Sequence, residues 1–346
     1  MFTIAVNGTY PRLPDPPRPA LLQRAIDDFA AGKIEEKDLR RAEDRASIET
    51  VAEMVAAGVE VASGGQIHWG NPEEFISRKL SGFRLDQDKN APGQINRPAP
   101  RAVERIKWVR PLVLDEYKFL SERSPVDIRP VLTGPFSLAL MYDTSEYPSG
   151  YTDFQDDLAA ALNRELIGLV SAGARFILIE EPLLTNRKLF IDDFIRISKI
   201  LLEGVECSIM LGTSRGDLRG LERITDECSF SGYALDMIEG VGNHDLLENK
   251  VFPDDCIIQL GVVHSRHPRL EEAEEITERL LKCAKFHDPG LTWAAPTGGL
   301  GILPRDLAFE KLSALYRGVL KARKQLAGEE EPGGKVPEDN SDHDLS

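Results

Sequence analysis

Cysteine is scarce in this sequence of 346 residues. There are only four cysteines, they are widely spaced, and no two of them form a C-x-x-C pair. A disulfide framework or a zinc ribbon needs closely grouped cysteines, so this spacing argues against both kinds of scaffold. We expect reduced, buried thiols at Cys207, Cys228, Cys256 and Cys283.

Long apolar runs are also missing. No stretch approaches the roughly 20 apolar residues that are needed to cross a bilayer. The first ten residues lack the basic region, the apolar run and the small-residue cleavage site of a secretory signal. We therefore expect a cytoplasmic protein with no membrane partner.

The sequence has no excess of positive charge. Its formal net charge is −15 at pH 7, and no basic patch stands out along the chain. A polyanion such as nucleic acid would be repelled by that average field. The expected partner is therefore a small-molecule substrate and not a nucleic acid, and the sequence leaves the oligomeric state open.

Acidic residues are concentrated at the end of the sequence. Residues 327–346 hold seven acids against one lysine, together with glycine and proline and almost no apolar residues. A segment of this composition cannot bury enough apolar surface to fold. We predict a folded domain over residues 1–326 and a disordered acidic tail over residues 327–346.

Short apolar runs alternate with helical stretches along the rest of the chain. Runs that end in Gly, Pro or polar residues and alternate with helices are typical of a parallel sheet built from βα units. The eight predicted strands are Thr3–Val6, Val59–Ala62, Ile128–Leu132, Phe176–Ile179, Cys207–Leu211, Tyr233–Leu235, Ile257–Val262 and Thr292–Ala295.

Helices are predicted between these runs, where apolar residues recur with a period near 3.6. One such stripe runs along residues 158–169, and Gly173 stands where a helix C-cap would end it. The predicted helices are Pro19–Ala31, Glu36–Ala57, Thr152–Ala172, Leu189–Leu202, Leu270–Lys285 and Arg305–Gln325.

These elements predict an α/β fold, a (β/α)8 TIM barrel in one domain with a long insertion after the second strand. The insertion, Trp69 to Pro125, combines a loop around Asn90–Pro100, a short segment Ile106–Val109 and a helix Asp115–Arg123. An open, doubly wound sheet is the alternative. It is disfavoured because no glycine-rich dinucleotide fingerprint follows an early strand.

Polar residues crowd the carboxyl ends of the predicted strands, where the chemistry of a barrel takes place. Glu180 and Glu181 are neighbours at one such end, so their side chains point to opposite faces and only one can reach the cavity. The other strand-end candidates include Thr9, Gln66, His68, Trp69, Asp236, Glu239, His264, Arg266, His267 and Gly298.

Several strand ends carry short motifs. In chain order they are Asn7-Gly8-Thr9-Tyr10-Pro11, Leu132-Thr133-Gly134-Pro135, Ile179-Glu180-Glu181-Pro182 and Leu260-Gly261-Val262. As a set they resemble the catalytic, C-terminal half of cobalamin-independent methionine synthase and its single-barrel archaeal relatives, in the superfamily that includes uroporphyrinogen decarboxylase. The resemblance covers roughly residues 1–326. It implies a methyltransferase of methionine biosynthesis, with folate as a candidate methyl donor.

The resemblance also implies a zinc site that this sequence does not keep. The family holds zinc with a His-x-Cys pair after the fifth strand, a Glu after the sixth and a Cys after the eighth. The matching positions here are Met210, Gly212, Glu239 and Gly298. One carboxylate cannot hold zinc, which takes three or four protein ligands. We therefore expect a degenerate zinc site and no cofactor; if a metal site has been rebuilt, its candidate ligands are Glu239, His264 and His267.

A substrate-binding set follows from the same resemblance. Thr9 keeps the hydroxyl of the family's first-turn Ser, while Gln66 and Glu180 replace two acids that hold the amino group of homocysteine. An ammonium-bearing substrate is thus compatible with the site but no longer demanded. Trp69 could stack on a flat ligand such as a pterin ring. The predicted substrate-binding residues are Thr9, Gln66, Trp69, Glu180, Glu239 and Gly298.

The loop after the seventh strand supplies most of the candidate catalytic groups. The family's catalytic His aligns with Arg266, and His264 and His267 stand on either side of it. Proton transfer could move to a neighbouring histidine, and Arg266 could bind an anionic group. The predicted catalytic residues are His264, Arg266, His267 and Glu180.

Three functions are compatible with this pattern. The first is a methionine synthase-like enzyme that transfers a one-carbon group, or makes or breaks a C–S or C–C bond, without the usual zinc. The second is a zinc-free lyase or decarboxylase of the uroporphyrinogen decarboxylase type. The third is a non-catalytic barrel that binds a ligand.

Overall fold

Parallel strands form the centre of the molecule. The computed structural model describes residues 1–85 and 99–328. Seven strands make one parallel sheet in the order β1-β11-β10-β9-β8-β7-β6. Their bounds are Thr3–Ile4 (β1), Val131–Thr133 (β6), Phe176–Glu180 (β7), Ser208–Gly212 (β8), Gly232–Asp236 (β9), Ile257–Val263 (β10) and Thr292–Pro296 (β11).

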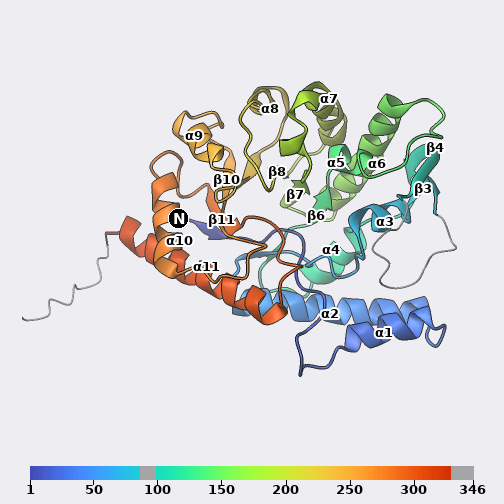
Figure 1. The fold of residues 1–346 in the computed structure, drawn as a ribbon, viewed down its shortest axis with the longest axis horizontal. Helices are drawn as coiled ribbons and strands as arrows, with labels where there is room; N and C mark the ends of the chain where they lie inside the picture. The colour runs from blue at the N-terminus through green and yellow to red at the C-terminus, as the bar shows by residue number, and fades with distance from the viewer. Residues whose placement is uncertain (86–98, 329–346) are drawn as a thin grey trace, which may run out of the picture.

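Two further strands close the sheet, part of which is labelled in Figure 1, into a barrel. Strand β2 (Val61–Ala62) pairs in parallel with β5 (Asp127–Ile128), and a bridge from Ala5 to Val61 joins β2 to the end of β1. Strand β6 follows β5 after an interruption at Pro130, which has no N–H to donate to a neighbouring strand. Together β5 and β6 fill one barrel position. The predicted α/β class and (β/α)8 barrel are confirmed, and the open doubly wound alternative is wrong.

The predicted helices are all present, with boundaries shifted by a few residues. Leu158, Leu162, Leu166 and Leu169 are buried along α6, and Gly173 adopts a positive φ of 94° beyond the end of that helix. The longer helices are α1 (Leu21–Ala30), α2 (Glu36–Ala56), α4 (Leu114–Ser121), α6 (Tyr151–Ser171), α7 (Ile191–Leu202), α10 (Ala273–Cys283) and α11 (Arg305–Leu326). Shorter helical segments are α3 (Pro72–Ser77), α5 (Pro135–Ala139), α8 (Arg223–Glu227), α9 (Gly242–Glu248), η2 (Leu184–Asn186) and η3 (Lys188–Phe190).

The insertion after β2 contains an antiparallel hairpin that the sequence did not predict. Strands β3 (Leu80–Arg84) and β4 (Arg101–Trp108) pair through a register shift. Because of this irregularity the buried residues of β4, Ala102 and Ile106, lie four apart and do not alternate as in a regular strand. The predicted loop lies largely outside the described residues, and so does nearly all of the predicted acidic tail.

The barrel interior changes from apolar to polar along the strands. One interior cluster is Ala5, Val61, Val131, Leu178, Met210, Ala234 and Trp293. Successive side chains alternate between faces, so a residue two positions further on faces the interior again. Those positions introduce polar groups at the carboxyl end of the barrel, among them Asn7, Ser63, Thr133 and Glu180. Among the described helices, none has the length and apolar character needed to span a membrane.

Candidate functional site

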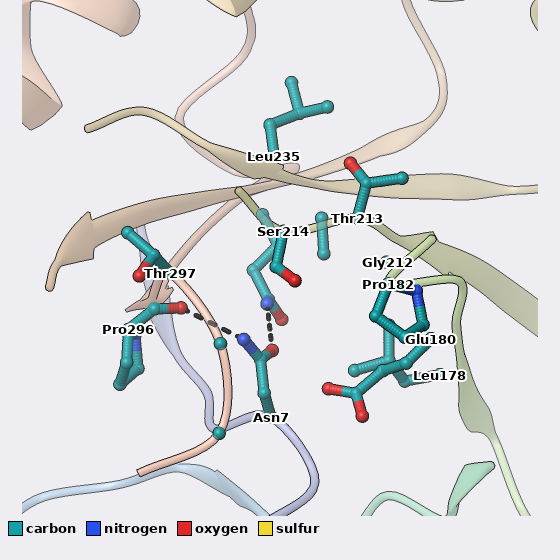
Figure 2. Close-up of a pocket in the computed structure, with 14 residues that line it drawn as sticks. Asn7, Leu178, Glu180, Pro182, Gly212, Thr213, Ser214, Leu235, Pro296 and Thr297 are labelled. Atoms are coloured by element: carbon teal, nitrogen blue, oxygen red, sulfur yellow. Dashed lines mark hydrogen bonds between the residues drawn. The ribbon is translucent and has the colours of Figure 1, made fainter. Parts of the chain in front are cut away.

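A cavity opens at the carboxyl ends of the barrel strands (Figure 2). It encloses about 500 Å³, a volume that includes the space open to solvent. Its walls come from β1, β7, β8, β9, β10 and β11 and the loops that follow them. The lining residues are Asn7, Leu178, Glu180, Pro182, Gly212, Thr213, Ser214, Ala234, Leu235, Gln259, Pro296, Thr297, Gly298 and Gly299.

Glu180 is the only ionisable residue among those that line this cavity. It ends β7, and its Oε1 accepts the Gly8 N–H at 3.4 Å. Burial raises the pKa of Glu180, and the Gly8 hydrogen bond and the positive charge of Arg129 counteract part of that rise. The carboxylate thus faces the cavity with most of its hydrogen-bonding capacity unused.

Two amides and a hydroxyl add further acceptors. The Asn7 Nδ2 donates to the Pro296 carbonyl at 3.1 Å, which leaves its Oδ1 to accept the Gln259 Nε2 at 2.7 Å. The amide orientation of Gln259 is therefore fixed, and its Oε1 is buried without a hydrogen-bond partner, as is the Thr213 Oγ1. Glu180, Gln259 and Thr213 together present acceptor oxygens to the same cavity.

Glu181 faces the opposite side of β7, as predicted. Its two carboxylate oxygens accept the backbone N–H groups of Phe136 at 3.1 Å and Ser137 at 2.7 Å, at the start of α5. Burial raises the pKa of Glu181 to about 7, although these hydrogen bonds oppose the rise. Glu181 therefore stabilises the turn at Gly134 and Pro135 and does not reach the cavity.

Arg129 is a buried charge that the sequence analysis missed. Its guanidinium donates to the Val6 carbonyl at 2.5 Å and to the Met210 Sδ at 3.3 Å, and no carboxylate among the described residues lies within ion-pair distance. Burial lowers the pKa of Arg129 to about 10, so the group still carries its charge at neutral pH. The sequence feature that could have revealed Arg129 is the presence of an arginine inside the apolar run Ile128–Leu132.

Gln66 and Thr9 flank the first glycine turn. Gln66 adopts a positive φ of 52°. A Cβ built on Gly8 would lie 2.7 Å from the Gln66 Nε2 and 3.1 Å from the Glu180 Oε2, so the structure brings these two predicted residues together. The Thr9 Oγ1 accepts the Gly301 N–H at 3.4 Å, and a Cβ on Gly299 would collide with the same hydroxyl.

Trp69 and His68 lie away from this first cavity. Trp69 is 5% exposed and stacks on Phe75, with ring centroids 4.5 Å apart and an interplanar angle of 15°. One face of the indole is therefore covered by protein. Burial alone would lower the pKa of His68, but the carboxylates of Glu43, Glu116 and Asp44 together raise it.

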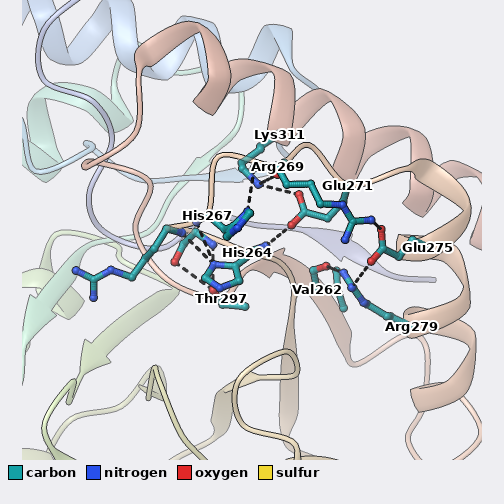
Figure 3. A network of polar contacts seen from close by, with 11 residues as sticks. Val262, His264, His267, Arg269, Glu271, Glu275, Arg279, Thr297 and Lys311 are labelled. Atoms are coloured by element: carbon teal, nitrogen blue, oxygen red, sulfur yellow. Dashed lines mark hydrogen bonds and ion pairs between the residues drawn. The ribbon is translucent and has the colours of Figure 1, made fainter.

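The loop after β10 holds the histidines in fixed orientations (Figure 3). The His264 Nδ1 accepts the backbone N–H groups of Arg266 and His267, both at 3.2 Å. A neutral His264 must therefore carry its proton on Nε2, which lies 3.5 Å from the Glu239 Oε1. Arg266 and His267 are exposed on the loop, and neither lines the cavity.

A buried ion pair anchors the same loop (Figure 3). The Lys311 Nζ, from the N-terminal half of α11, donates to the Glu271 Oε2 at 2.8 Å and to the Arg269 carbonyl at 2.5 Å. The other Glu271 oxygen accepts the His264 N–H at 2.8 Å. On the opposite side the Ser265 N–H donates to the Thr297 Oγ1 at 3.1 Å, which joins the loop to the cavity wall.

The residues present do not fit a zinc centre. Among the positions that the resemblance assigns to zinc ligands, Gly212 and Gly298 have no side chain, and the Met210 sulfur accepts a hydrogen bond from Arg129. The alternative set of Glu239, His264 and His267 does not fit zinc either, because the His264 Nδ1 already accepts hydrogen bonds. Residues 1–85 and 99–328 contain no group of three His, Cys, Asp or Glu residues that could hold a metal ion. Glu239 instead pairs with His264.

The chain matches a family model that describes the N-terminal domain of the cobalamin-independent synthase. The match covers residues 97–287, more than half of the chain. The sequence is also 28% identical over 323 residues to a protein named methionine synthase from Sulfurisphaera tokodaii, covering 93% of this chain and 92% of that protein. Methionine synthase from Thermococcus kodakarensis is 28% identical over 327 residues, with 94% of each chain covered.

A solved structure has the same fold. It is a B12-independent methionine synthase from Shewanella sp. W3-18-1 in complex with selenomethionine, and it superimposes with a TM-score of 0.80 at 18% sequence identity. The superposition covers 95% of this chain and 99% of that one. The barrel fold of this chain is thus a known architecture.

Proposed function

Because the chain belongs to the cobalamin-independent methionine synthase family, we propose that it is a methyltransferase-type enzyme acting on a small amino-bearing substrate in the barrel-mouth cavity. The family expected from the strand-end motifs is confirmed. The matched model describes the N-terminal domain, whereas the motifs were likened to the catalytic half, which carries the zinc. The absence of a fitting zinc donor set agrees with that difference.

The observation that carries the proposal is the acceptor-rich wall of the cavity. The Glu180 carboxylate, the Gln259 Oε1 and the Thr213 Oγ1 all face it, and the latter two are buried without partners. An ammonium group has three donors and a positive charge, so it can satisfy all three acceptors at once. Burial of these acceptors without such a group is costly, which favours a ligand that supplies donors.

His264 is the best-placed group for proton transfer. Its Nε2–H points toward the Glu239 carboxylate, which can accept a proton, and its neighbour Ser265 contacts Thr297 in the cavity wall. We assign general acid or base chemistry to this pair at the rim of the cavity. Arg266, exposed on the same loop, is proposed to bind an anionic group of the substrate, with the exposed His267 as a secondary proton carrier.

Metal-free activation has a chemical consequence. A thiol acceptor must lose its proton before it attacks a methyl group, since the thiolate is the nucleophile. Without a fitting zinc site, that proton has to leave to a protein base, for which the Glu239 carboxylate of the His264–Glu239 pair is the candidate, because the His264 Nδ1 already accepts two backbone N–H groups. Folate as methyl donor and homocysteine as acceptor remain the reaction implied by the family, and methionine biosynthesis is then the process served.

The decisive experiment is a turnover assay in chelator-treated buffer with methyltetrahydrofolate and homocysteine, preceded by elemental analysis for zinc. We expect metal-free protein to form methionine, and E180Q to lose most of this activity. The exposed Glu278, on α10, gives the matched control E278Q, which should behave as the unchanged protein.

Other outcomes separate the alternatives. Zinc-dependent turnover would overturn the metal-free mechanism. Tight binding of an amino acid without any turnover would favour the ligand-binding barrel, and release of carbon dioxide from an added carboxylic acid would favour the decarboxylase.

A further inference from the structure

A buried carboxylate joins the loops that follow β8 and β9. Asp236 ends β9 and is 1% exposed. Its Oδ1 accepts the backbone N–H groups of Ile238 and Glu239, both at 2.9 Å. Its Oδ2 accepts the Arg215 N–H, from the loop after β8, at 3.1 Å. One side chain therefore holds the backbone of Glu239 and the backbone of the neighbouring loop.

A buried amide makes a second connection between the same two loops. Asn243, on α9, is fully buried. Its Nδ2 donates to the Asp236 carbonyl at 2.9 Å and to the Gly216 carbonyl at 3.4 Å, and its Oδ1 accepts the Leu218 N–H at 3.1 Å. Separating the loops would leave these buried groups without partners, which is costly. The two loops are thus held in one relative position.

The loops are also too close together to admit a side chain between them. A Cβ on Gly240, the residue after Glu239, would lie 2.3 Å from the Gly216 carbonyl oxygen and 2.5 Å from that of Asp236. Arg215 adopts a positive φ of 57°. This conformation is uncommon for a non-glycine residue and persists where surrounding contacts impose it. The hydrogen bond from the Arg215 N–H to Asp236 is such a contact.

Each of the two loops carries a part of the proposed site. Ser214 precedes Arg215 and lines the cavity (Figure 2). The Glu239 carboxylate lies 3.5 Å from the His264 Nε2, and the described residues offer it no other polar partner. Its position therefore depends on the backbone that carries it. A displacement of about 1 Å at a catalytic group can cost about 100-fold in rate, so the anchor of this backbone matters for the chemistry.

We propose that Asp236 is the positioning residue of the Glu239–His264 pair. By holding the Glu239 N–H and the Arg215 N–H with one carboxylate, it sets the proton acceptor at a fixed distance from the cavity wall. A carboxylate suits this task because it accepts several hydrogen bonds on two oxygens and donates none. This role rests on the proposed function, in which the pair removes the proton of the substrate.

The experiment follows the Cε1–H signal of His264 at a fixed pH, in protein labelled with ¹³C at histidine. The H264Q variant identifies this signal among those of the six histidines. E239A removes the carboxylate from the ring and gives the reference shift. We expect D236A to produce roughly half of that shift or more, because the Glu239 backbone loses its anchor. Partial unfolding lowers the intensity of the signal and not its position, so the readout separates positioning from stability.

Two further variants serve as matched controls. D236N keeps an acceptor oxygen for the Glu239 N–H and replaces only the oxygen that faces Arg215, so it should produce less than roughly a quarter of the reference shift. D217A removes a carboxylate of the loop after β8 whose partners all lie outside the loop after β9. It should leave the His264 signal where it is.

A second route reaches the same loops if D236A folds poorly. G240A leaves Asp236 in place but forces a methyl group against the Gly216 carbonyl, so the two loops must move apart. It should shift the His264 signal as E239A does. An unmoved signal in folded D236A protein, or in G240A protein where D236A does not fold, would overturn the role of Asp236. Equal shifts in D236A and D236N, or in D236A and D217A, would do the same.

This readout does not depend on turnover. With the proposed reaction in place, kcat per folded molecule should fall about tenfold or more in D236A, while the KM of the amino-bearing substrate, which binds at Glu180, should change less than about threefold. Failure of methyl transfer in the unchanged protein, with a shifted His264 signal in D236A, would reject the proposed reaction and keep the positioning of the pair. Normal methyl transfer with an unmoved signal would do the reverse.

Discussion

Glu180 and Glu181 are adjacent in the sequence, the first half-buried and the second buried, yet they belong to two different regions of the molecule. Glu180 faces the barrel mouth, where one weak hydrogen bond from Gly8 leaves most of its acceptor capacity free. Glu181 faces the wall, where two backbone N–H groups at the start of α5 occupy both of its oxygens. Hydrogen bonds to the backbone tie Glu181 to the fold, whereas the free oxygens of Glu180 are available to a ligand. The hydrogen-bond partners of the two carboxylates, more than their burial or charge, distinguish the structural residue from the candidate functional one.

The largest effect that this comparison predicts is at the Lys311–Glu271 pair, the most completely satisfied ion pair of the loop that carries His264. K311M leaves the Glu271 carboxylate buried without its cation, which should cost about 3–5 kcal/mol of stability. Denaturant unfolding measures this loss. In the double variant K311M/E271Q a neutral amide can still accept the His264 N–H, so much of the stability should return. No recovery would show that the charge itself holds the loop.

Glu181 should give the next largest effect, as a dependence of stability on pH. Its pKa is raised to about 7 by burial, so its contribution to stability is fully present below the unfolded value near 4.5 and is lost as the pH rises through about 7. The loss should amount to about 3 kcal/mol. Denaturant unfolding from pH 4 to pH 8 measures it. E181Q should flatten this dependence, and an unchanged dependence in that variant would contradict its assignment to Glu181.

Glu180 should show its importance in activity and not in stability. E180Q keeps the shape of the side chain but removes the charge that the ammonium group needs, so kcat/KM should fall about 100-fold, close to 3 kcal/mol of transition-state stabilisation. The free energy of unfolding should not fall, because the folded state disfavours the charged form that this substitution removes. Steady-state kinetics and denaturant unfolding of the same preparation test both halves. A large loss of stability would place Glu180 with Glu181 as a structural residue.

The eight barrel strands and the polar character of their ends could be predicted from the sequence because both follow from local patterns. The β3–β4 hairpin could not, since its register shift removes the alternation that marks a strand. Arg129 and Glu116 were missed for another reason. Each stands in an ordinary strand or helix pattern, and only the packing of α4 against the end of β2 brings them to one cavity. The sequence predicted Trp69 to lie near a ligand because it follows a strand end. Its stacking on Phe75 is a tertiary contact that no local pattern reveals.

The smallest predicted effect concerns Gln66, the one position where the amino-binding wall lacks the acid implied by the family. Q66E places a second carboxylate near Glu180, with Gly8 between them. Repulsion between like charges should reduce stability by about 1 kcal/mol and raise the pKa of Glu180 further. Two carboxylates should nevertheless bind an amino-bearing ligand such as methionine about tenfold more tightly than one, which calorimetry can measure. Tighter binding at a cost in stability is what an acceptor site for a cation requires. Weaker binding would show that the ligand prefers the neutral amide at position 66. The ammonium group would then have to bind away from this end of the cavity.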